Sequence, residues 1–480
     1  MTEMTIIDHY VHGASLKPAG GEYLESQNPA DGSVVANVAA GTAEDVDKAV
    51  KSAREAAGPW ADVRPQARAQ ILYRIATMLR ENQAELSLAE TLENGKPISN
   101  SRFDIEVSAR YFDYYAGAVD KFHGETIPLG PDYLSYTRLE PFGVTAHIVP
   151  WNAPIQQAAR GFAPALAVGN TIVAKPAEET SITCIRLAEI ASKCGLPPGV
   201  INVITGRGEV AGDALVRHPD VDKIAFTGSL ATGRLIMIAA AERVIPVTLE
   251  LGGKSPNIVF EDADLDAAAR GAIRAINFNA GQVCSAGSRL LVHVSVHDEM
   301  VRRLVELDRE VTLGPGIEDP NMGPMTTTDQ WNKVRYYLDL AKQEGAKFAC
   351  GGGVPEDSKL RGGQFIEPTV IVDVDNSMRI AREEIFGPVL CVIPFHNDEE
   401  AVAIANDSEF GLVAGLWTSN LSRAHRVAAR LQAGQVFVNE YFAGGVETPF
   451  GGYKRSGVGR EKGLEALKHY AQLKTVSIRL

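Results

Sequence analysis

The chain has 480 residues, of which 45% are hydrophobic and 22% are charged, and 45 of them are glycines. This length predicts two or three domains with a sizeable core, and the composition is that of a globular protein. The formal net charge of −13 argues against a nucleic acid or an anionic membrane surface as the main partner.

The N-terminal stretch MTEMTIIDHYVHG lacks a basic region followed by an apolar segment, and no run approaches the ~20 apolar residues that span a bilayer. We therefore expect a cytoplasmic enzyme with no membrane partner. Five cysteines without C-x-x-C spacing predict neither a disulfide framework nor a zinc site. Free thiols and no metal are expected.

Apolar residues at spacings of three and four predict helices over residues 43–57 and 68–87, the second a long amphipathic helix. From Gly143 onward, short β-branched runs alternate with helical segments. The predicted strands are VTAHIV, TIVAK, GVINVITG, KIAFTG and VTLEL. This alternation predicts an α/β fold with a doubly wound, mostly parallel sheet. A second α/β region begins near Gly253.

Two further segments, residues 130–141 and 469–480, have the alternating pattern of strands. Neither fits the two α/β regions. Each could add to the sheet edge of a neighbouring subunit.

The stretch FNAGQVCSAGSRL places Cys284 among small residues that allow a substrate to approach. A thiolate is the reactive form of cysteine, whose ordinary pKa is about 8.5. On this pattern alone, Cys284 could equally be a small buried residue.

Two polar residues end predicted strands upstream of Cys284. Glu250 interrupts the apolar run VIPVTLELGG, where burial would raise its pKa toward that of a general base. Backbone N–H groups of the glycine turn could instead hold it. Asn152, between two prolines in IVPWNAP, could donate to an oxyanion, or could serve a turn or a helix cap.

Two other predicted strands end in residues suited to a nucleotide. IVAKPAEE ends with Lys175 and Glu178, and IAFTGSLATG ends with Ser229 at the start of a helix, where backbone N–H groups can bind a pyrophosphate. The fingerprint G-x-G-x-x-G is absent, because GRGEVAG has one residue too many.

Taken together, these segments resemble the NAD(P)-dependent aldehyde dehydrogenase superfamily. The motifs PWNAP, KPAEET, GLPPGVINVITG, FTGS, LELGGKSP, FNAGQVCSAGSR, EEIFGPV and PFGGYKRSGVGREKG occur in the family's order over nearly the whole chain. The resemblance implies oxidation of an aldehyde to a carboxylic acid. It also implies that the departure from the usual dinucleotide fingerprint is a family trait.

By the same resemblance, Cys284 is the nucleophile that forms a thiohemiacetal, and Asn152 with the backbone N–H of Cys284 binds its oxyanion. After hydride transfer, Glu250 activates the water that hydrolyses the thioester. The residues expected to bind the cofactor are Val149, Pro150, Trp151, Lys175, Glu178, Gly208, Gly212, Phe226, Thr227, Gly228, Ser229, Leu251, Gly252, Glu384 and Phe386.

Glu178 is expected at the adenosine ribose with Lys175. A carboxylate there accepts a hydrogen bond from the 2′-hydroxyl and repels a 2′-phosphate, so we predict NAD in preference to NADP.

The substrate pocket is expected to be wider and more polar than one for short alkyl aldehydes. Its expected lining includes Gln157, Arg160, Phe278, Val283, Ser285 and Phe442. Arg160 could face an anionic substrate tail, or it could lie on the surface or pair with a neighbouring acid. An aromatic aldehyde or a semialdehyde is the predicted substrate.

The family fold divides the chain into an NAD-binding domain (residues 1–118 and 141–252), a catalytic domain (253–452) and a small β oligomerisation element with the C-terminal tail (119–140 and 453–480). The two strand-like segments are expected at a subunit interface, in a homodimer or homotetramer.

Three other functions compete. A cysteine hydrolase would need a histidine in a motif with Cys284, and none of the ten histidines provides one. A CoA-acylating dehydrogenase would generally lack the glutamate at position 250. A non-enzymatic protein on this fold would have no reason to keep Cys284, Glu250 and Asn152 together.

Overall fold

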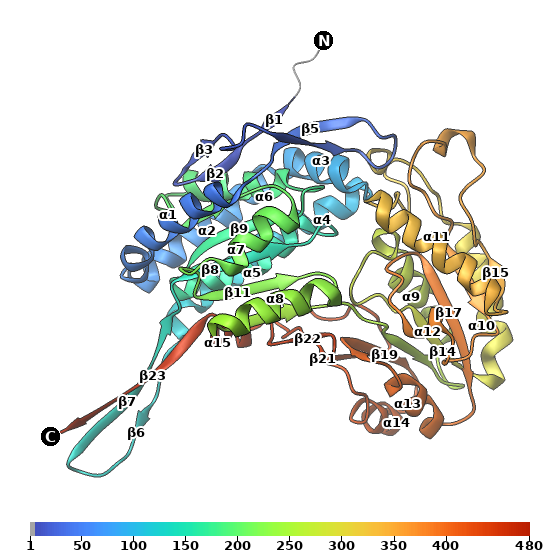
Figure 1. Ribbon diagram of the computed structural model, residues 1–480. Helices are drawn as coiled ribbons and strands as arrows, with labels where there is room; N and C mark the ends of the chain where they lie inside the picture. The colour runs from blue at the N-terminus through green and yellow to red at the C-terminus, as the bar shows by residue number, and fades with distance from the viewer. Residues whose placement is uncertain (1–4) are drawn as a thin grey trace.

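The computed structural model describes residues 5–480. Two α/β regions lie side by side and a narrow β arm projects from the first, ending near the C-terminus (Figure 1). The first region is built on an eight-stranded sheet in the order β22-β12-β11-β8-β9-β10-β2-β3. Its strands are β22 (Gly457–Val458), β12 (Val247–Glu250), β11 (Lys223–Thr227), β8 (Val144–Val149), β9 (Thr171–Pro176), β10 (Ile201–Val203), β2 (His9–Val11) and β3 (Ala14–Leu16).

The five central strands of this sheet are parallel, and the chain reverses its winding direction between β8 and β11. This is the doubly wound arrangement that the alternation of β-branched runs and helices predicts. The associated helices are α1 (Ala43–Ala61), α2 (Pro65–Glu81), α3 (Gln83–Asn94), α4 (Ile98–Ala118), α5 (Pro154–Val168), α6 (Ile182–Lys193), α7 (Asp213–Arg217), α8 (Leu230–Arg243) and α15 (Glu465–His469).

One predicted helix is wrong in length. Instead of a single helix over residues 68–87, α2 ends at Glu81 and α3 begins at Gln83. Asn82 has φ −101° and ψ 14°, and its side-chain amide donates to the carbonyl of Met78 at 2.7 Å. Asparagine competes with the helix for backbone groups in this way, which the apolar periodicity does not reveal.

The second region is built on a seven-stranded sheet that is parallel except at β15. Its strands, in spatial order, are β15 (Lys347–Cys350), β16 (Thr369–Val372), β17 (Val389–Phe395), β14 (Arg289–His293), β13 (Pro256–Val259), β19 (Val413–Trp417) and β20 (Gln435–Val438). Its helices are α9 (Leu265–Asn277), α10 (His297–Arg309), α11 (Thr328–Gln343), α12 (Arg379–Arg382), α13 (Asp398–Asn406) and α14 (Leu421–Ala428).

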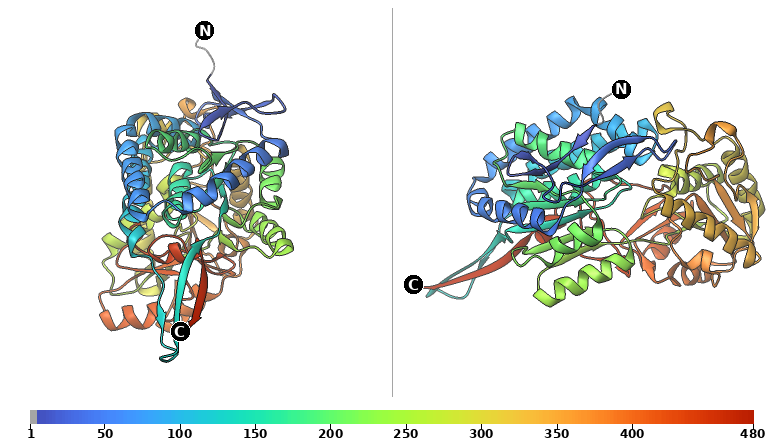
Figure 2. Two further views of the ribbon diagram at one scale, coloured as in Figure 1. Left: turned by 90° about the vertical axis from the view of Figure 1, so that its left-hand side faces the viewer. Right: turned by 45° about the horizontal axis from the view of Figure 1, so that its top comes forward.

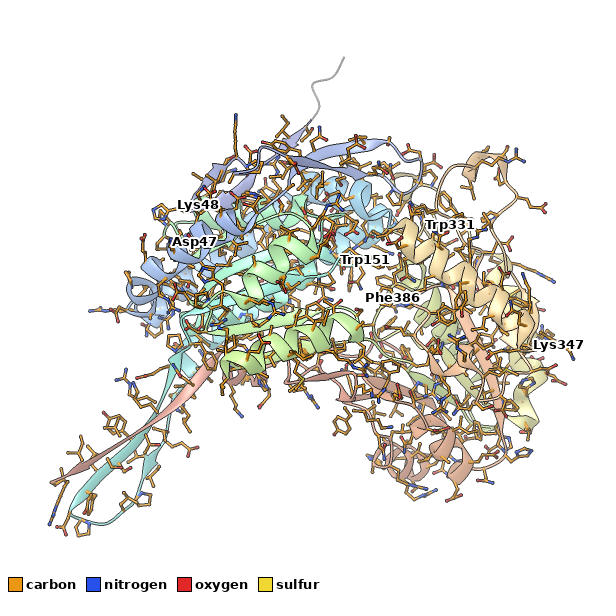
Figure 3. All side chains as sticks on the ribbon, in the orientation of Figure 1. Asp47, Lys48, Trp151, Trp331, Lys347 and Phe386 are labelled. Atoms are coloured by element: carbon orange, nitrogen blue, oxygen red, sulfur yellow. The ribbon has the colours of Figure 1, made fainter. Side chains whose placement is uncertain are left out.

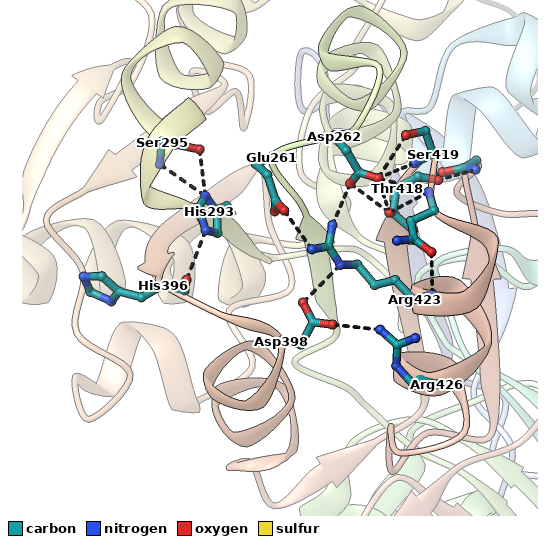
Figure 4. Close-up of polar contacts among 12 residues, drawn as sticks. Glu261, Asp262, His293, Ser295, His396, Asp398, Thr418, Ser419, Arg423 and Arg426 are labelled. Carbon is teal, nitrogen blue, oxygen red and sulfur yellow. Dashed lines mark hydrogen bonds and ion pairs between the residues drawn. The ribbon is translucent and has the colours of Figure 1, made fainter.

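Arg423 on α14 fixes the far side of the second region. Its guanidinium contacts Glu261 at 2.7 Å, Asp262 at 2.9 Å and Asp398 at 3.0 Å (Figure 4). It therefore ties α14 to the segment after β13 and to the start of α13. These charges satisfy one another, and none of them lines the cavities described below.

The arm is a three-stranded antiparallel sheet of β6 (Thr126–Ile127), β7 (Tyr133–Pro141) and β23 (Ala471–Arg479). The two strand-like segments of the sequence thus pair with each other within one chain, from Tyr133 opposite Arg479 to Pro141 opposite Ala471. Both views of Figure 2 show the arm standing away from the body.

Two small sheets complete the fold. They comprise β1 (Ile6–Ile7), β5 (Val34–Ala39) and β4 (Tyr23–Gln27), and the pair β18 (Phe410–Gly411) and β21 (Tyr453–Lys454). Because β21 pairs with β18 and β22 pairs with β12, residues 453–458 join the body rather than the arm. No helix within residues 5–480 is long and apolar enough to cross a membrane.

Candidate active site

The carboxyl ends of four parallel strands meet at one edge of the eight-stranded sheet. The register places Thr227 beside Glu250 and Val149 beside Pro176. Strand ends at a winding reversal form the crevice where α/β sheets bind ligands. The segments that follow β8, β9, β11 and β12 carry most of the predicted site residues, and the fold brings these segments to one edge.

Cys284 follows a turn that lies between α9 and β14 in the second region. Asn279 and Ala280 both have left-handed backbone conformations, with φ of 49° and 53°. The Cys284 side chain is half-buried. Burial raises the pKa of its thiol to about 11, although the positive charge of Arg160 opposes the shift. The thiol is thus protonated at neutral pH in the cofactor-free protein.

Asn152 is fixed against the Cys284 turn by reciprocal hydrogen bonds. Its side-chain amide donates to the carbonyl of Gln282 at 2.9 Å, and the amide of Asn279 donates to its backbone carbonyl at 2.9 Å. The Asn94 side chain also holds this segment, by donating to the carbonyl of Trp151 at 2.8 Å. One N–H of Asn152 is left over from the bond to Gln282 and is available to a ligand.

Glu250 is 2% exposed, and neither of its carboxylate oxygens has a hydrogen-bond partner among the described residues. Burial raises its pKa well above the ordinary value, and the charge of Glu461 adds to the shift. The backbone of Gly451 packs so closely that a Cβ there would lie 2.8 Å from Glu250 Oε1. A buried carboxyl group that has no hydrogen-bond partner and a raised pKa is a candidate general base.

Two cavities meet at Cys284, and Gln157 also lines both of them. A cavity of about 160 Å³ lies on the side of the eight-stranded sheet. It is lined by Pro150, Trp151, Asn152, Gln157, Thr227, Gly228, Ser229, Glu250, Gly252, Cys284, Gln330, Lys333, Glu384 and Phe386. A larger cavity of about 490 Å³ opens on the other side of Cys284.

The smaller cavity collects eight of the predicted cofactor residues. Trp151 and Phe386 face each other edge to face at 5.4 Å between the two regions (Figure 3). The half-buried Glu384 accepts a hydrogen bond from the N–H of Gly253 at 3.1 Å, and a Cβ at Gly252 would overlap its carboxylate. Ser229 caps α8 by accepting from the N–H of Thr232 at 3.2 Å.

Seven predicted cofactor residues do not line that cavity. Lys175 and Glu178 pair at 3.0 Å at the end of β9, where Gly212 lies against the lysine stem. The pair lowers the pKa of Glu178, although burial opposes the shift. Phe226 and Leu251 are buried in the core under Gly228 and Gly233. The others are Val149, at the buried end of β8, and Gly208, which begins a helical turn closed by Gly212.

All six residues predicted for the substrate line the larger cavity: Gln157, Arg160, Phe278, Val283, Ser285 and Phe442. Arg160, however, is only 6% exposed and forms an ion pair with Glu461. It also donates to the hydroxyl of Thr227 at 3.3 Å. Of the alternatives that the sequence left open for Arg160, the structure therefore shows the ion pair with a neighbouring acid.

Sequence reasoning missed several lining residues. Gln330 and Lys333, from α11, line the smaller cavity, and Gln330 holds the left-handed Phe386 segment by donating to two carbonyls. Arg274 and Lys462 line the larger cavity. The only signal for Lys462 was its place in the motif PFGGYKRSGVGREKG. Arg274 lies on the amphipathic helix α9, and no sequence pattern indicated a role for it. Within residues 5–480 no cluster of acidic, histidine or cysteine side chains could hold a metal.

A half-buried cysteine between a strand-end crevice and a second, larger cavity is typical of a two-region α/β enzyme. The chain belongs to the aldehyde dehydrogenase family, whose model matches residues 16–476. It is therefore an oxidoreductase that acts on aldehydes.

Three relatives illustrate the likeness. The chain is 45% identical to the aldehyde dehydrogenase DhaS of Bacillus subtilis (strain 168), over 98% of this chain and 95% of that one. It is 45% identical to a betaine aldehyde dehydrogenase of Brucella melitensis biotype 2, over 98% and 97%. An indole-3-acetaldehyde dehydrogenase solved with NAD+ superposes with a TM-score of 0.97 at 44% identity, over 99% and 97%.

That neighbour is a complex with NAD+. The residues present fit a dinucleotide. The N-terminus of α8, a 14-residue helix, opens at the crevice with Ser229 as its cap. Gly228 and Gly252 leave room that a Cβ would fill. The half-buried carboxylate of Glu384 can accept hydrogen bonds from ribose hydroxyls.

Proposed function

We propose that this protein oxidises an aldehyde to its carboxylic acid with NAD through a covalent intermediate on Cys284. The observation that carries the proposal is the meeting of the two cavities at the Cys284 thiol, with Asn152 and Glu250 lining the smaller one. A thiol in this position would face both an aldehyde bound in the larger cavity and a nicotinamide cofactor held by the residues of the smaller one.

In the first step the Cys284 thiol loses its proton to solvent, the resulting thiolate adds to the aldehyde carbon, and the carbonyl electrons move to oxygen. The free N–H of Asn152 and the backbone N–H of Cys284 stabilise that oxyanion. Donors of this kind contribute roughly 10²- to 10³-fold in rate where they have been tested. Because Asn152 is already fixed by Gln282, it needs no reorganisation as the charge develops.

When bound, NAD accepts the hydride from the carbon attached to sulfur. The oxyanion then reforms a carbonyl, and Cys284 carries a thioester. Glu250 removes a proton from water, the oxygen attacks the thioester, and the C–S bond breaks to release the acid and the thiolate. The raised pKa of Glu250 makes it a stronger base than an exposed carboxylate.

We further propose that NAD is preferred to NADP. The Lys175–Glu178 pair at 3.0 Å holds the carboxylate in its charged form, where it would accept from a 2′-hydroxyl and repel a 2′-phosphate. Comparable kcat/KM values for the two cofactors would contradict this assignment.

The proposed substrate is larger or more polar than acetaldehyde, being an aromatic aldehyde or a semialdehyde. The support is the volume of the larger cavity, about 490 Å³, and its lining of six aromatic rings and four amide side chains. We also propose that the chain assembles as a homodimer or homotetramer through its arm.

Absorbance at 340 nm with NAD and an aldehyde panel tests the reaction. Cys284→Ala should abolish NADH formation while NAD binding, followed by quenching of tryptophan fluorescence, stays within about threefold of the wild type. Cys350→Ala, a change at another half-buried free cysteine, is the matched control and should keep full turnover. Turnover by Cys284→Ala would overturn the proposal, and acceleration by added coenzyme A would favour the acylating alternative.

A further inference from the structure

The charges that line the larger cavity are all positive. Arg160, Arg274 and Lys462 face it, together with neutral amide and aromatic side chains. Among its described lining residues there is no aspartate or glutamate. Because Arg160 is already paired with Glu461, the unbalanced charges are those of Arg274 and Lys462.

Lys462 has no carboxylate within ion-pair distance and no side-chain hydrogen bond in the described part of the chain. Its ammonium group lies 5.6 Å from the centre of the Phe450 ring. Arg160 approaches the same ring at 5.3 Å. Two cations therefore lie against one aromatic ring, and the one carboxylate beside them, that of Glu461, pairs with Arg160. Burial, helped by the charge of Arg160, lowers the pKa of Lys462 to about 8.

The backbone holds Lys462 in an uncommon conformation. Its φ is +62°, a left-handed value that favours glycine over lysine. Phe450 and Glu461 exchange backbone hydrogen bonds of 2.7 and 2.8 Å on one side of it, and Gly463 donates to Val446 at 2.8 Å on the other. Such over-determined strain is characteristic of functional positions.

Arg274 provides a second cation nearer to solvent. It extends from α9, is exposed, and has no ion pair among residues 5–480. It also lines an adjoining surface hollow of about 360 Å³. Phe278 lies between Arg274 and Cys284 in the sequence. It lines both the larger cavity and the adjoining surface hollow. An anion entering the cavity would therefore meet Arg274 as well as Lys462.

We propose that the substrate is an aldehyde that carries a carboxylate on a bulky, preferably aromatic body, and that Lys462 binds this carboxylate with Arg274 at the cavity mouth. The proposal rests on the aldehyde oxidation proposed above and specifies the chemistry of its substrate. A carboxylate would neutralise the unpaired ammonium and form a charge-assisted hydrogen bond with it. The aromatic walls would bury the body of the molecule.

The same geometry disfavours a cationic aldehyde. Betaine aldehyde, the substrate named for the Brucella relative, has a quaternary ammonium group. Aromatic rings can bind such a group, but here two unpaired cations share the cavity with the rings. Repulsion between like charges in a partly desolvated cavity opposes its binding.

A matched set of three aromatic aldehydes tests the proposal: 4-carboxybenzaldehyde, benzaldehyde and 4-(trimethylammonio)benzaldehyde. We expect kcat/KM to fall in that order, by roughly 10- to 100-fold from the anion to the neutral compound, the worth of one charge-assisted hydrogen bond. Equal or reversed values would overturn the proposal while leaving aldehyde oxidation intact. If none of these aldehydes, nor any aliphatic one, yields NADH, the proposed function itself fails.

Variants at position 462 test whether Lys462 is responsible for the preference for the aldehyde that carries a carboxylate. Lys462→Met should lower the ratio of kcat/KM for 4-carboxybenzaldehyde to that for benzaldehyde by roughly 10- to 100-fold, chiefly through KM. Lys462→Arg, which keeps the charge, should restore most of the ratio. Lys17→Met, a change of an exposed lysine on the other region, should leave it unchanged. An unchanged ratio in Lys462→Met would overturn the assignment.

Discussion

At the scale of single residues, burial raises the pKa values of two groups in the site. The Cys284 thiol and the Glu250 carboxyl group both have raised pKa values, so both favour their neutral forms in the cofactor-free protein. Each would need to lose its proton to react. Activity that depends on both groups should therefore increase as the pH rises.

The thiol can be measured directly by alkylation with iodoacetamide in the absence of cofactor. The pKa of about 11 predicts that the rate constant at Cys284 rises about tenfold per pH unit from pH 7 to pH 10. Peptide mass spectrometry identifies the modified residue, because four other free cysteines are present. A plateau below pH 8 would contradict the predicted pKa.

Arg160 and Lys462 show how far the role of a charged residue can be predicted from the sequence. The sequence left open whether Arg160 faces the substrate or pairs with a neighbouring acid, and in the structure it lines the cavity and is paired. Its partner Glu461 lies in a distant segment that the fold brings beside it, so no local pattern could identify the pair. Glu461, the sequence neighbour of Lys462, pairs with Arg160 instead, and this pairing depends on three-dimensional packing.

At the scale of elements, the strand ends that carry the site follow from the sequence with little ambiguity. β8, β9, β11 and β12 are short β-branched runs, and their parallel order brings the following residues together. The break between α2 and α3 could not be predicted, because the apolar periodicity continues through Asn82. The C-terminal end of α3 then matters for the site, since Asn94 holds the Trp151 carbonyl.

Gly95, which ends α3, should not tolerate a side chain. Its φ is +87°, and a Cβ would lie 2.6 Å from Pro29 and 2.7 Å from Pro324. Gly95→Ala should cost about 2–4 kcal/mol of stability and lower the midpoint of thermal unfolding by differential scanning fluorimetry. Gly117→Ala, within α4, meets only the Tyr73 hydroxyl at 3.4 Å and is the control. Equal midpoints of thermal unfolding for Gly95→Ala and Gly117→Ala would contradict this prediction, because they would show that the protein accommodates a Cβ at position 95.

At the scale of the whole molecule, the arm is the part whose role the active site does not explain. β23 is the edge strand of the arm sheet, so its outer backbone groups have no strand partner in the described chain. Leu473 and Ile478 on β23 are 65% and 43% exposed, and Leu134 on the neighbouring β7 is 42% exposed. An apolar, unpaired edge that stands away from the body is suited to contact with a second copy.

Light scattering after gel filtration tests the assembly. We expect a mass of two or four times the 51.5 kDa of one chain at micromolar concentration. Replacing Leu473 and Ile478 together by glutamate should shift the protein towards the single-chain mass. Leu421→Glu, at a 73% exposed leucine on α14, should not. A wild-type protein of single-chain mass would contradict the proposed role of the arm.

The central claim, that oxidation proceeds through a thioester on Cys284 which Glu250 helps to hydrolyse, is tested most directly by rapid mixing of Glu250→Gln with NAD and 4-carboxybenzaldehyde or benzaldehyde. We predict a burst of about one NADH per active site followed by little turnover. Intact mass should show the acyl group on Cys284. Steady turnover at the wild-type rate, or no burst from a variant that still binds NAD, would contradict the mechanism.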